Sequence, residues 1–262
     1  MTKYLIGIDS GSTMCKAVLF DRVNNRIADI QSVKTGWNPE LSATEILGAL
    51  LDGNNLNRAD VYISTTGYGR EAIGFADCSF TEITCHALGG IFLEADIQGV
   101  IDIGGQDSKA IKIAEGKAVD FIMNDKCAAG TGRFLNMACD TLGISLDAID
   151  TFANPSEAIA INSMCTVFAE SEIIGSLAMK KDRSKIMTGV LHSIAQKVSQ
   201  MICKLGFADG KPLLMTGGLS KSKVLMRIIS EAIGFDVISH DDAVFAGGIG
   251  ACICAAKKIA GN

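Results

Sequence analysis

Two glycine turns that each carry an aspartate are the parts of this sequence best suited to hold a phosphate. The segment "IDSGSTMCKAVLF" begins at Ile8, and "IDIGGQDSKAIKI" begins at Ile101. Small residues let backbone N–H groups approach phosphate oxygens, and a carboxylate can hold Mg²⁺ directly or through water. The two segments align without a gap and coincide at Asp9 and Asp102, Gly11 and Gly104, Lys16 and Lys109, and Ala17 and Ala110. One such turn could be an ordinary hairpin, but two in matching contexts predict related lobes that share a cleft.

A third motif, "MTGGLSKS", has paired glycines flat enough for a base or ribose to lie against. The sequence has no G-x-x-x-x-G-K-[ST] segment, so the P-loop class is excluded. Besides the two aspartates, the candidate nucleotide residues of the three motifs are Gly11, Ser12, Thr13, Gly104, Gly105, Gln106, Asp107, Gly217, Gly218 and Lys221.

Two of the nine cysteines stand just before predicted helices. Cys127 lies in "MNDKCAAGTGRFL" and Cys165 in "SMCTVFAESE". A helix N-terminus lowers the pKa of a thiol and favours an anionic ligand, so both cysteines could bind a metal cluster. A [4Fe–4S] cluster needs four cysteine ligands, which a symmetric dimer with two per subunit would supply. From these residues alone, a buried structural role is the favoured alternative, because free cysteine is among the most buried residue types.

The remaining cysteines are expected to be structural. Cys85 stands beside His86 in "EITCHA", a pairing that suggests catalysis, but no third partner is evident and burial is the favoured interpretation. The sequence has no C-x-x-C pair, so it predicts neither a zinc ribbon nor a thioredoxin motif.

Strands and helices must position these residues. The pattern predicts a β-meander followed by a helix and a further strand, and then a second half richer in helices. The expected strands cover 4–9, 16–21, 26–35, 61–67, a stretch from 100 onward, and 212–218. The expected helices cover 44–51, 85–93, 131–142, 167–179, 184–205 and the apolar end of the chain from 243 to 260.

Composition and charge narrow the function classes. The chain has 262 residues, 48% of them hydrophobic, and a net charge of −5 without a basic stripe, so nucleic acid is not expected as a partner. The start, "MTKYLIGIDSG", has too short an apolar run for a secretory signal. The longest uncharged apolar stretch, Ala243 to Ala256, is shorter than the roughly 18 residues of a membrane span, which favours a buried helix. We therefore expect a cytoplasmic protein with no membrane partner and no disulfides.

The motifs resemble those of a known superfamily. "GIDSGST", "DIGGQDSK" and "MTGGLSKS" resemble the phosphate-1, phosphate-2 and adenosine motifs of acetate and sugar kinases, heat-shock chaperone ATPases and actin. "TGYGRE", "EITCHA" and the two cysteine motifs resemble a narrower group, the ATP-dependent activators of 2-hydroxyacyl-CoA dehydratases, which are BadF/BadG/BcrA/BcrD-type ATPases related to benzoyl-CoA reductase subunits. The resemblance covers nearly the whole chain.

This resemblance implies an α/β, two-lobed, actin-like ATPase fold with ribonuclease H-like lobes and a nucleotide cleft between them. Lobe I would comprise residues 1–95 plus 245–262, and lobe II residues 96–244. The cofactors implied are ATP or ADP, Mg²⁺ and one [4Fe–4S] cluster per homodimer, bound by Cys127 and Cys165 of both subunits. Asp9 and Asp102 would bind Mg²⁺, Lys16 would contact phosphate, and Gln106 or Asp107 would position the attacking water.

The implied function is the ATP-driven injection of one low-potential electron into a 2-hydroxyacyl-CoA dehydratase, or into a related aryl-CoA or double-cubane reductase. A reduced ferredoxin or flavodoxin would supply the electron. Two alternatives stay open. A small-molecule kinase of the same superfamily would use the same turns without iron, and a regulatory nucleotide sensor would bind a partner without electron transfer.

Overall fold

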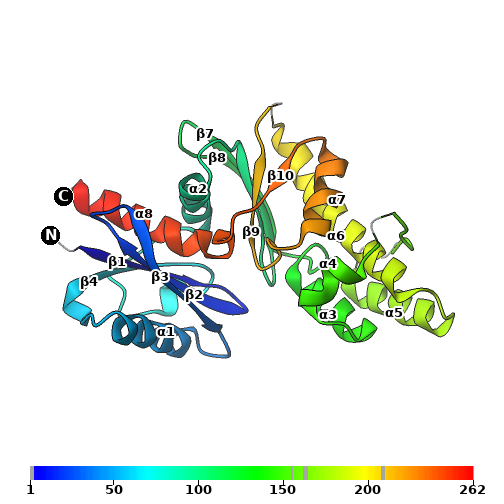
Figure 1. Cartoon of the computed structure of the whole chain (residues 1–262), viewed down its shortest axis with the longest axis horizontal. Helices are drawn as coiled ribbons and strands as arrows, with labels where there is room; N and C mark the ends of the chain where they lie inside the picture. The colour runs from blue at the N-terminus through cyan, green and yellow to red at the C-terminus, as the bar shows by residue number, and fades with distance from the viewer. Residues whose placement is uncertain (1–2, 155, 162–164, 208–209, 262) are drawn as a thin grey trace. The chain divides into compact units, whose positions relative to one another are not determined.

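The structure is a computed structural model that describes residues 3–154, 156–161, 165–207 and 210–261. The chain forms two compact units. Unit 1 comprises Met1–Ile97, Ile113–Val119 and His240–Asn262, and unit 2 comprises Gln98–Lys112 and Asp120–Ser239. The chain forms two five-stranded sheets with helices packed on them, as Figure 1 shows. The first sheet lies in unit 1, and the second lies in unit 2 except for Ile113–Val119, where two of its strands extend into unit 1.

The sheet of unit 1 has the strand order β3-β2-β1-β4-β5. β1 is antiparallel to β2 and parallel to β4. The strands are β1 (Tyr4–Ser10), β2 (Met14–Asp21), β3 (Arg26–Lys34), β4 (Val61–Thr66) and β5 (Cys78–Ser79). Successive side chains of a strand point to opposite faces, so a central strand that is apolar at every position must be covered on both faces.

Helices cover both faces of this sheet. α1 (Pro39–Gly53) packs with Ile6, Ile8 and their neighbours in one core cluster. α8 (Ala246–Ala260) packs on the alternate residues, with Ile249 and Cys252 against Leu5, and α2 (Glu82–Leu93) lies along α8. Short 3₁₀ helices connect these elements at Arg58–Asp60, Arg70–Ala72 and Ala243–Phe245.

The apolar end of the chain is a core helix of unit 1. Among the described residues, one helical stretch, Ala243–Ala260, is long and apolar enough to cross a membrane, and 56% of it is buried. Its small residues allow the close contacts with β1 and α2, because a Cβ at Gly250 would overlap the carbonyl oxygen of Cys85. Packing inside the unit therefore explains the low polarity of this helix.

The sheet of unit 2 has the strand order β10-β9-β6-β7-β8 and repeats the pairing of unit 1 at its centre. β6 is antiparallel to β7 and parallel to β9. The strands are β6 (Gly99–Ile103), β7 (Ser108–Ala114), β8 (Lys117–Asn124), β9 (Leu213–Gly217) and β10 (Val237–Ile238). The helices are α3 (Gly132–Leu142), α4 (Ile149–Phe152), α5 (Thr166–Ala178), α6 (Arg183–Leu205) and α7 (Lys223–Ile233), with a 3₁₀ turn at Leu146–Ala148.

The observed elements differ from the expected ones at their ends, in short pieces, and in two longer elements that were not predicted, β8 and α7. α1 begins five residues before the predicted start because Asn38 accepts hydrogen bonds from the N–H groups of Glu40 and Leu41, and Pro39 suits the first turn. α7 was not predicted, although the apolar positions Val224, Leu225 and Ile228 have helical spacing.

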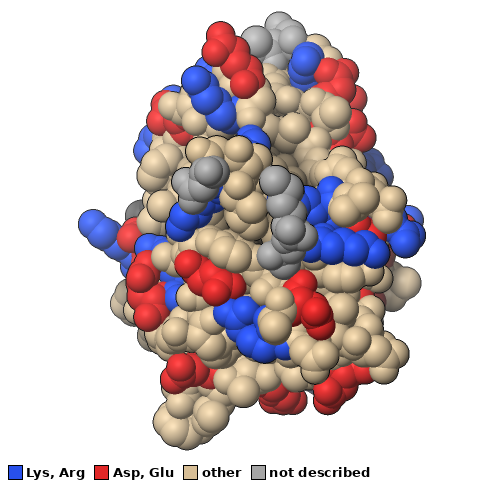
Figure 2. All heavy atoms as spheres, turned by 90° about the vertical axis from the view of Figure 1, so that its left-hand side faces the viewer, with Lys and Arg blue, Asp and Glu red and all other residues tan. Residues whose placement is uncertain are grey.

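Surface charges are mixed in sign. On the face shown in Figure 2, Lys and Arg side chains alternate with Asp and Glu side chains among the coloured residues.

Candidate functional site

The first aspartate turn is built at the end of the central strand of unit 1. Asp9 is buried, and its Oδ2 lies 3.4 Å from Nζ of Lys16, its partner on the neighbouring strand β2. The turn closes with a hydrogen bond from Gly11 N to Met14 O of 3.1 Å, and Ser12 and Thr13 lie at its tip. Thr35, the residue after β3, holds the turn, since its hydroxyl donates to Gly11 O at 2.7 Å. The backbone around these small residues is therefore fixed beside a buried carboxylate.

The second aspartate turn repeats this arrangement in unit 2. Asp102 is buried at the end of β6, and Lys109 Nζ lies 3.3 Å from its Oδ2. Gly104 N donates to Asp107 O at 2.9 Å, as Gly11 N does to Met14 O in the first turn. Lys109 Nζ also lies 2.9 Å from Asp107 Oδ2, so one buried ammonium serves two carboxylates. Gln106 is exposed at the tip of the turn.

A threonine–glycine pair completes each turn, and the sequence reasoning missed this part of the repeat. Thr66 and Thr216 are the parallel-strand partners of Asp9 and Asp102, and the Thr216 hydroxyl donates to Asp102 Oδ1 at 3.1 Å. Gly67 and Gly217 follow with φ of +89° and +82°, a region that favours glycine. A Cβ at either glycine would lie 2.7 Å from Oδ1 of its aspartate. The signal was the shared "TG" at the ends of β4 and β9.

The predicted adenosine residues follow β9. Gly217 is buried within the strand end, whereas Gly218 and Lys221 are exposed in the turn that leads to α7. Asp150 of α4 fixes the start of α7, because its carboxylate accepts from Ser222 Oγ and from Lys223 N, both at 2.7 Å. The turn is thus fixed at one end by β9 and at the other by Asp150, and the exposed Gly218 lies between these two points.

Each of the three nucleotide motifs also carries a buried serine whose hydroxyl has no hydrogen-bond partner within the described residues. These serines are Ser10, Ser108 and Ser220. A buried polar atom without a partner in the protein is a place where water or a ligand atom is needed.

Cys127 lies in a loop that other residues hold in shape. Asn124 donates from Nδ2 to the carbonyl oxygens of Cys127 at 2.9 Å and of Ala129 at 3.0 Å. Gly130 has a φ of +90°. The Thr131 hydroxyl donates a hydrogen bond to the carbonyl oxygen of Ala128 at 2.7 Å. Cys127 itself is half-buried.

The same loop is joined to the second aspartate turn. At the start of α3, Gly132 N donates to Gly104 O and Arg133 N to Gly105 O, both at 2.9 Å. These two N–H groups are therefore satisfied by the glycine turn, which connects the turn directly to the loop of Cys127.

Cys165 occupies a different position. It is the N-cap residue of α5, it is exposed, and the next two apolar side chains, Val167 and Phe168, are each 68% exposed. The start of α5 thus presents two large apolar side chains to solvent close to the thiol. Ser163 and Met164 of the same motif lie outside the described residues.

Two cysteines per chain fit half of an iron–sulfur site. Neither takes part in a disulfide; Cys127 lies in the loop held by Asn124, and Cys165 lies at the exposed start of α5. Among the described residues of a single chain, there is no group of three or more His, Cys, Asp or Glu side chains that could hold a metal ion. Two thiols on each of two chains would make up the four ligands that a [4Fe–4S] cluster takes.

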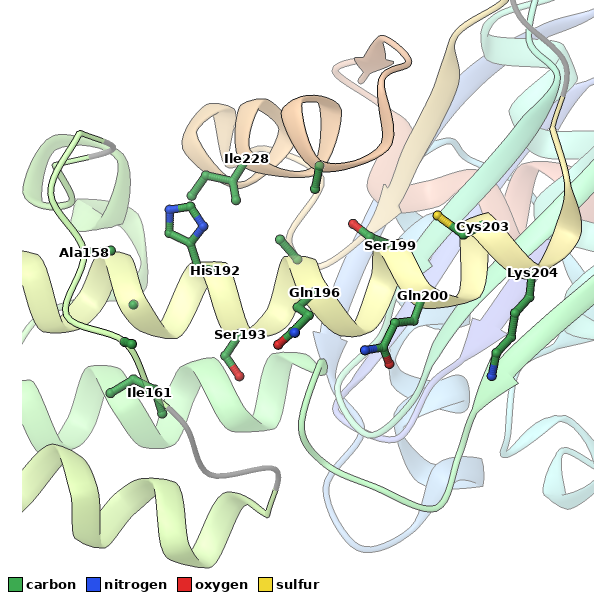
Figure 3. Close-up of a pocket in the computed structure, with 14 residues that line it drawn as sticks. Ala158, Ile161, His192, Ser193, Gln196, Ser199, Gln200, Cys203, Lys204 and Ile228 are labelled. Carbon is green, nitrogen blue, oxygen red and sulfur yellow. The ribbon is translucent and has the colours of Figure 1, made fainter.

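A separate hollow of about 1010 Å³ lies along α6 in unit 2, and none of the predicted site residues line it. Figure 3 shows His192 on the side of α6 that faces Ile228 of α7, and Ser193, Gln196 and Gln200 on the other side of α6.

Comparison with known proteins identifies the family. Residues 6–255 match the BadF/BadG/BcrA/BcrD ATPase family. An uncharacterised Escherichia coli protein, YjiL, is 41% identical over 95% of this chain and 96% of its own length. The (R)-2-hydroxyglutaryl-CoA dehydratase activating ATPase of Acidaminococcus fermentans is 36% identical over 99% of this chain and 100% of its own length.

Solved structures agree in fold. The activator of the 2-hydroxyisocaproyl-CoA dehydratase from Clostridium difficile, solved with bound ADPNP, has a TM-score of 0.91 and 32% identity and covers 98% of this chain and 96% of its own. A ROK family glucokinase from Streptomyces griseus, at 15% identity and a TM-score of 0.59 over 96% of this chain and 98% of its own, shares the fold alone. The fold is that of the actin-like ATPases and sugar kinases, and the chain belongs to the BadF/BadG/BcrA/BcrD ATPase family.

Proposed function

We propose that this chain is an ATP-hydrolysing activator that passes a low-potential electron to a 2-hydroxyacyl-CoA dehydratase or a related reductase. The observation that carries the proposal is the pair of hydrogen bonds from the start of α3 to Gly104 and Gly105. Through them, any movement of a phosphate-binding turn reaches the loop of Cys127. Full-length similarity to a dehydratase activating ATPase supports the same function.

The two aspartate turns would bind the nucleotide. In this proposal Asp9 and Asp102 hold Mg²⁺ directly or through water, and the N–H groups of the glycine turns bind the phosphates. Lys16 contacts phosphate, and Gln106 or Asp107 positions the attacking water. Gly217, Gly218 and Lys221 contact the adenosine. The lobes proposed for this work are 1–95 plus 245–262 and 96–244.

Cys127 and Cys165 would hold one [4Fe–4S] cluster between two copies of the chain. The cluster, when bound, accepts one electron and gives it up at low potential. The exposed Val167 and Phe168 beside Cys165 support a dimer through this surface, because association would remove them from water. ATP must bind two conformations with different affinity for its binding to shift α3 and the loop.

The proposed partners are a dehydratase or reductase component, and a ferredoxin or flavodoxin as electron donor. The proposed location is the cytoplasm, where such donors and acyl-CoA substrates are found together.

Anaerobic reconstitution with iron and sulfide tests the cluster assignment. We expect roughly four irons per dimer in the unchanged protein. Cys127→Ala and Cys165→Ala should each lose most of this iron, whereas Cys203→Ala, a change at another exposed cysteine, should keep it. Retention of the full iron content in the Cys127→Ala protein would show that the ligand assignment is wrong.

Electron delivery is tested separately. The reconstituted protein should hydrolyse ATP and reduce an added dehydratase component only when ATP is present. Phosphate transfer from ATP to a sugar by iron-free protein would instead favour a kinase.

A further inference from the structure

Helices α2 and α8 of unit 1 come unusually close together. A Cβ at Gly250 would overlap the backbone of Cys85, and one at Gly89 would overlap Ala246. Glycine at these positions lets the two helices approach to backbone contact. Cys254 lies one turn after Gly250, and residues four apart share one face of a helix. The side chain of Cys254 is thereby brought to the side of α8 that meets Cys85.

The two cysteines form a thiol pair in a small apolar cluster. Cys85, Ala251 and Cys254 pack together with Phe80 and Leu88 around them. Cys85 is fully buried and packs in this cluster with Cys254, which is 7% exposed. The sequence predicted a structural role for Cys85, and its burial agrees with this, but the partner on α8 was not foreseen.

The pair opens onto a hollow that carries positive charge. Cys254 lines a hollow of about 460 Å³ together with Lys257 and Lys258 of the same helix. The remaining lining residues are Phe80, Thr84, Leu88, Lys117 and Ala118. Hydrogen peroxide fits such a space with ease, and the ammonium groups favour the thiolate form of a cysteine beside them.

The two thiols are not equivalent. Cys254 lines the hollow beside Lys257 and Lys258, whereas Cys85 is fully buried behind it. The neighbouring Cys85 thiol and the charge of Lys257 lower the pKa of Cys254, and its partner and burial raise the pKa of Cys85. Cys254 is therefore placed to react first, with Cys85 as the proton-bearing partner. This asymmetry is the one found in peroxide-sensitive dithiols, in which one thiolate attacks and a neighbouring thiol resolves the product.

We propose that Cys85 and Cys254 form an oxidation site for peroxides that closes a disulfide between α2 and α8. The Cys254 thiolate attacks one peroxide oxygen and breaks the O–O bond, giving a sulfenic acid and hydroxide. The Cys85 thiol then attacks the Cys254 sulfur, the S–O bond breaks, and water leaves. Overall, two thiols lose two electrons and two protons, and one peroxide becomes two waters.

The site borders the first aspartate turn. His86 follows Cys85, and a Cβ at Gly247 would lie 3.1 Å from His86 Nε2 and 2.7 Å from Asp9 Oδ2. The proposed disulfide would therefore join two helices whose residues adjoin the buried carboxylate of Asp9.

Peptide mapping after limited oxidation tests the proposal. The anaerobically purified full-length protein is treated with one equivalent of hydrogen peroxide, alkylated under denaturing conditions and digested. We expect a peptide that joins Cys85 to Cys254 to be the first cross-link, while Cys139, buried in unit 2, stays reduced. The proposal is overturned if Cys85 and Cys254 are alkylated as fully as Cys139.

Three variants separate the roles. Cys254→Ala, which keeps the site small and apolar, should abolish oxidation of Cys85. Cys85→Ala should leave a sulfenic acid on Cys254 that a dimedone reagent traps, and Lys257→Ala should slow cross-linking several-fold. A normal circular dichroism spectrum of each variant shows that it is folded. Equal cross-linking rates in the unchanged and Lys257→Ala proteins would show that the positive charge in the hollow does not assist the reaction. The outcome is independent of the proposed electron transfer, since it is read from the thiols alone.

Discussion

At the scale of single residues, the ammonium of Lys109 determines how the second aspartate turn is held together. It is 3% exposed and lies within 3.3 Å of Asp102 and 2.9 Å of Asp107. Two carboxylates this close would repel each other without it, and buried charges need a partner to remain ionised. The turn therefore depends on a lysine that need not touch the nucleotide.

We expect Lys109→Met to lower the free energy of unfolding by about 3 kcal/mol, because it leaves a buried carboxylate unpaired. The matched control is Arg227→Met, which breaks an exposed ion pair with Glu231 of 2.8 Å. That change should cost less than about 0.5 kcal/mol. Urea denaturation of both proteins measures the difference, and equal losses would contradict the account of the turn.

A buried thiol predicts a dependence of stability on pH. Burial, with the nearby Asp140 carboxylate, raises the pKa of Cys139 to about 11. In the unfolded chain a thiol has a pKa of about 8.5. Between these two values the unfolded state releases the proton and the folded state keeps it, so stability is full below about pH 8.5 and falls as the pH rises toward about 11.

Cys139→Ala should therefore flatten this alkaline loss of stability, although it costs some packing at neutral pH. The measurement is the free energy of unfolding in urea at several pH values between about 8 and 10.5, under reducing conditions. An unchanged slope in the variant would mean that Cys139 does not contribute.

At the scale of elements, the strand-end glycines determine where backbone can meet a ligand. Gly217 has a φ of +82°, and a Cβ there would lie 2.7 Å from Asp102 Oδ1. Gly234, at the end of α7, has a similar φ of +75° but no atom within 4 Å of the same position. Substituting alanine for each glycine therefore separates two contributions to the loss of stability, the left-handed backbone conformation and the crowding of the added methyl group.

We expect Gly234→Ala to destabilise the protein by about 1 kcal/mol, the cost of a left-handed conformation. Gly217→Ala should cost about 1–3 kcal/mol more because the added methyl group forces a shift of the turn. It should also weaken ATP binding, which Gly234→Ala should leave unchanged. Calorimetric titration with ATP checks the second expectation, and similar ATP affinities of the two variants would argue against adenosine contact near Gly217.

At the scale of the whole molecule, the exposed start of α5 is where a second copy is expected. Phe168→Ser removes an apolar side chain next to Cys165, and by the energetics of interface anchors it should weaken the dimer by about tenfold or more. Met179→Ser is the control, since Met179 is similarly exposed, at 65%, beyond the other end of α5. Sedimentation under anaerobic conditions measures both, and a dimer as stable in Phe168→Ser as in Met179→Ser would place the interface elsewhere.

Much of the fold could be predicted from the sequence because its signals are local. The apolar runs of the central strands, the acidic glycine turns and the cysteine motifs each lie within about ten residues. The start of α1 was missed because it depends on the cap at Asn38, and α7 was missed although its helical spacing was present. The first error concerns where a helix begins and the second whether a helix is present, and neither changes the type of fold.

By itself, the sequence determined the family and the two related turns, because two segments that align residue by residue can be recognised as equivalent without a structure. The tertiary structure alone decided which residues support them. Lys109 between two carboxylates, α3 bonded to Gly104 and Gly105, and Cys85 against Cys254 are contacts of this kind. Such contacts join strands or helices whose register is set by packing, and no spacing along the chain specifies them.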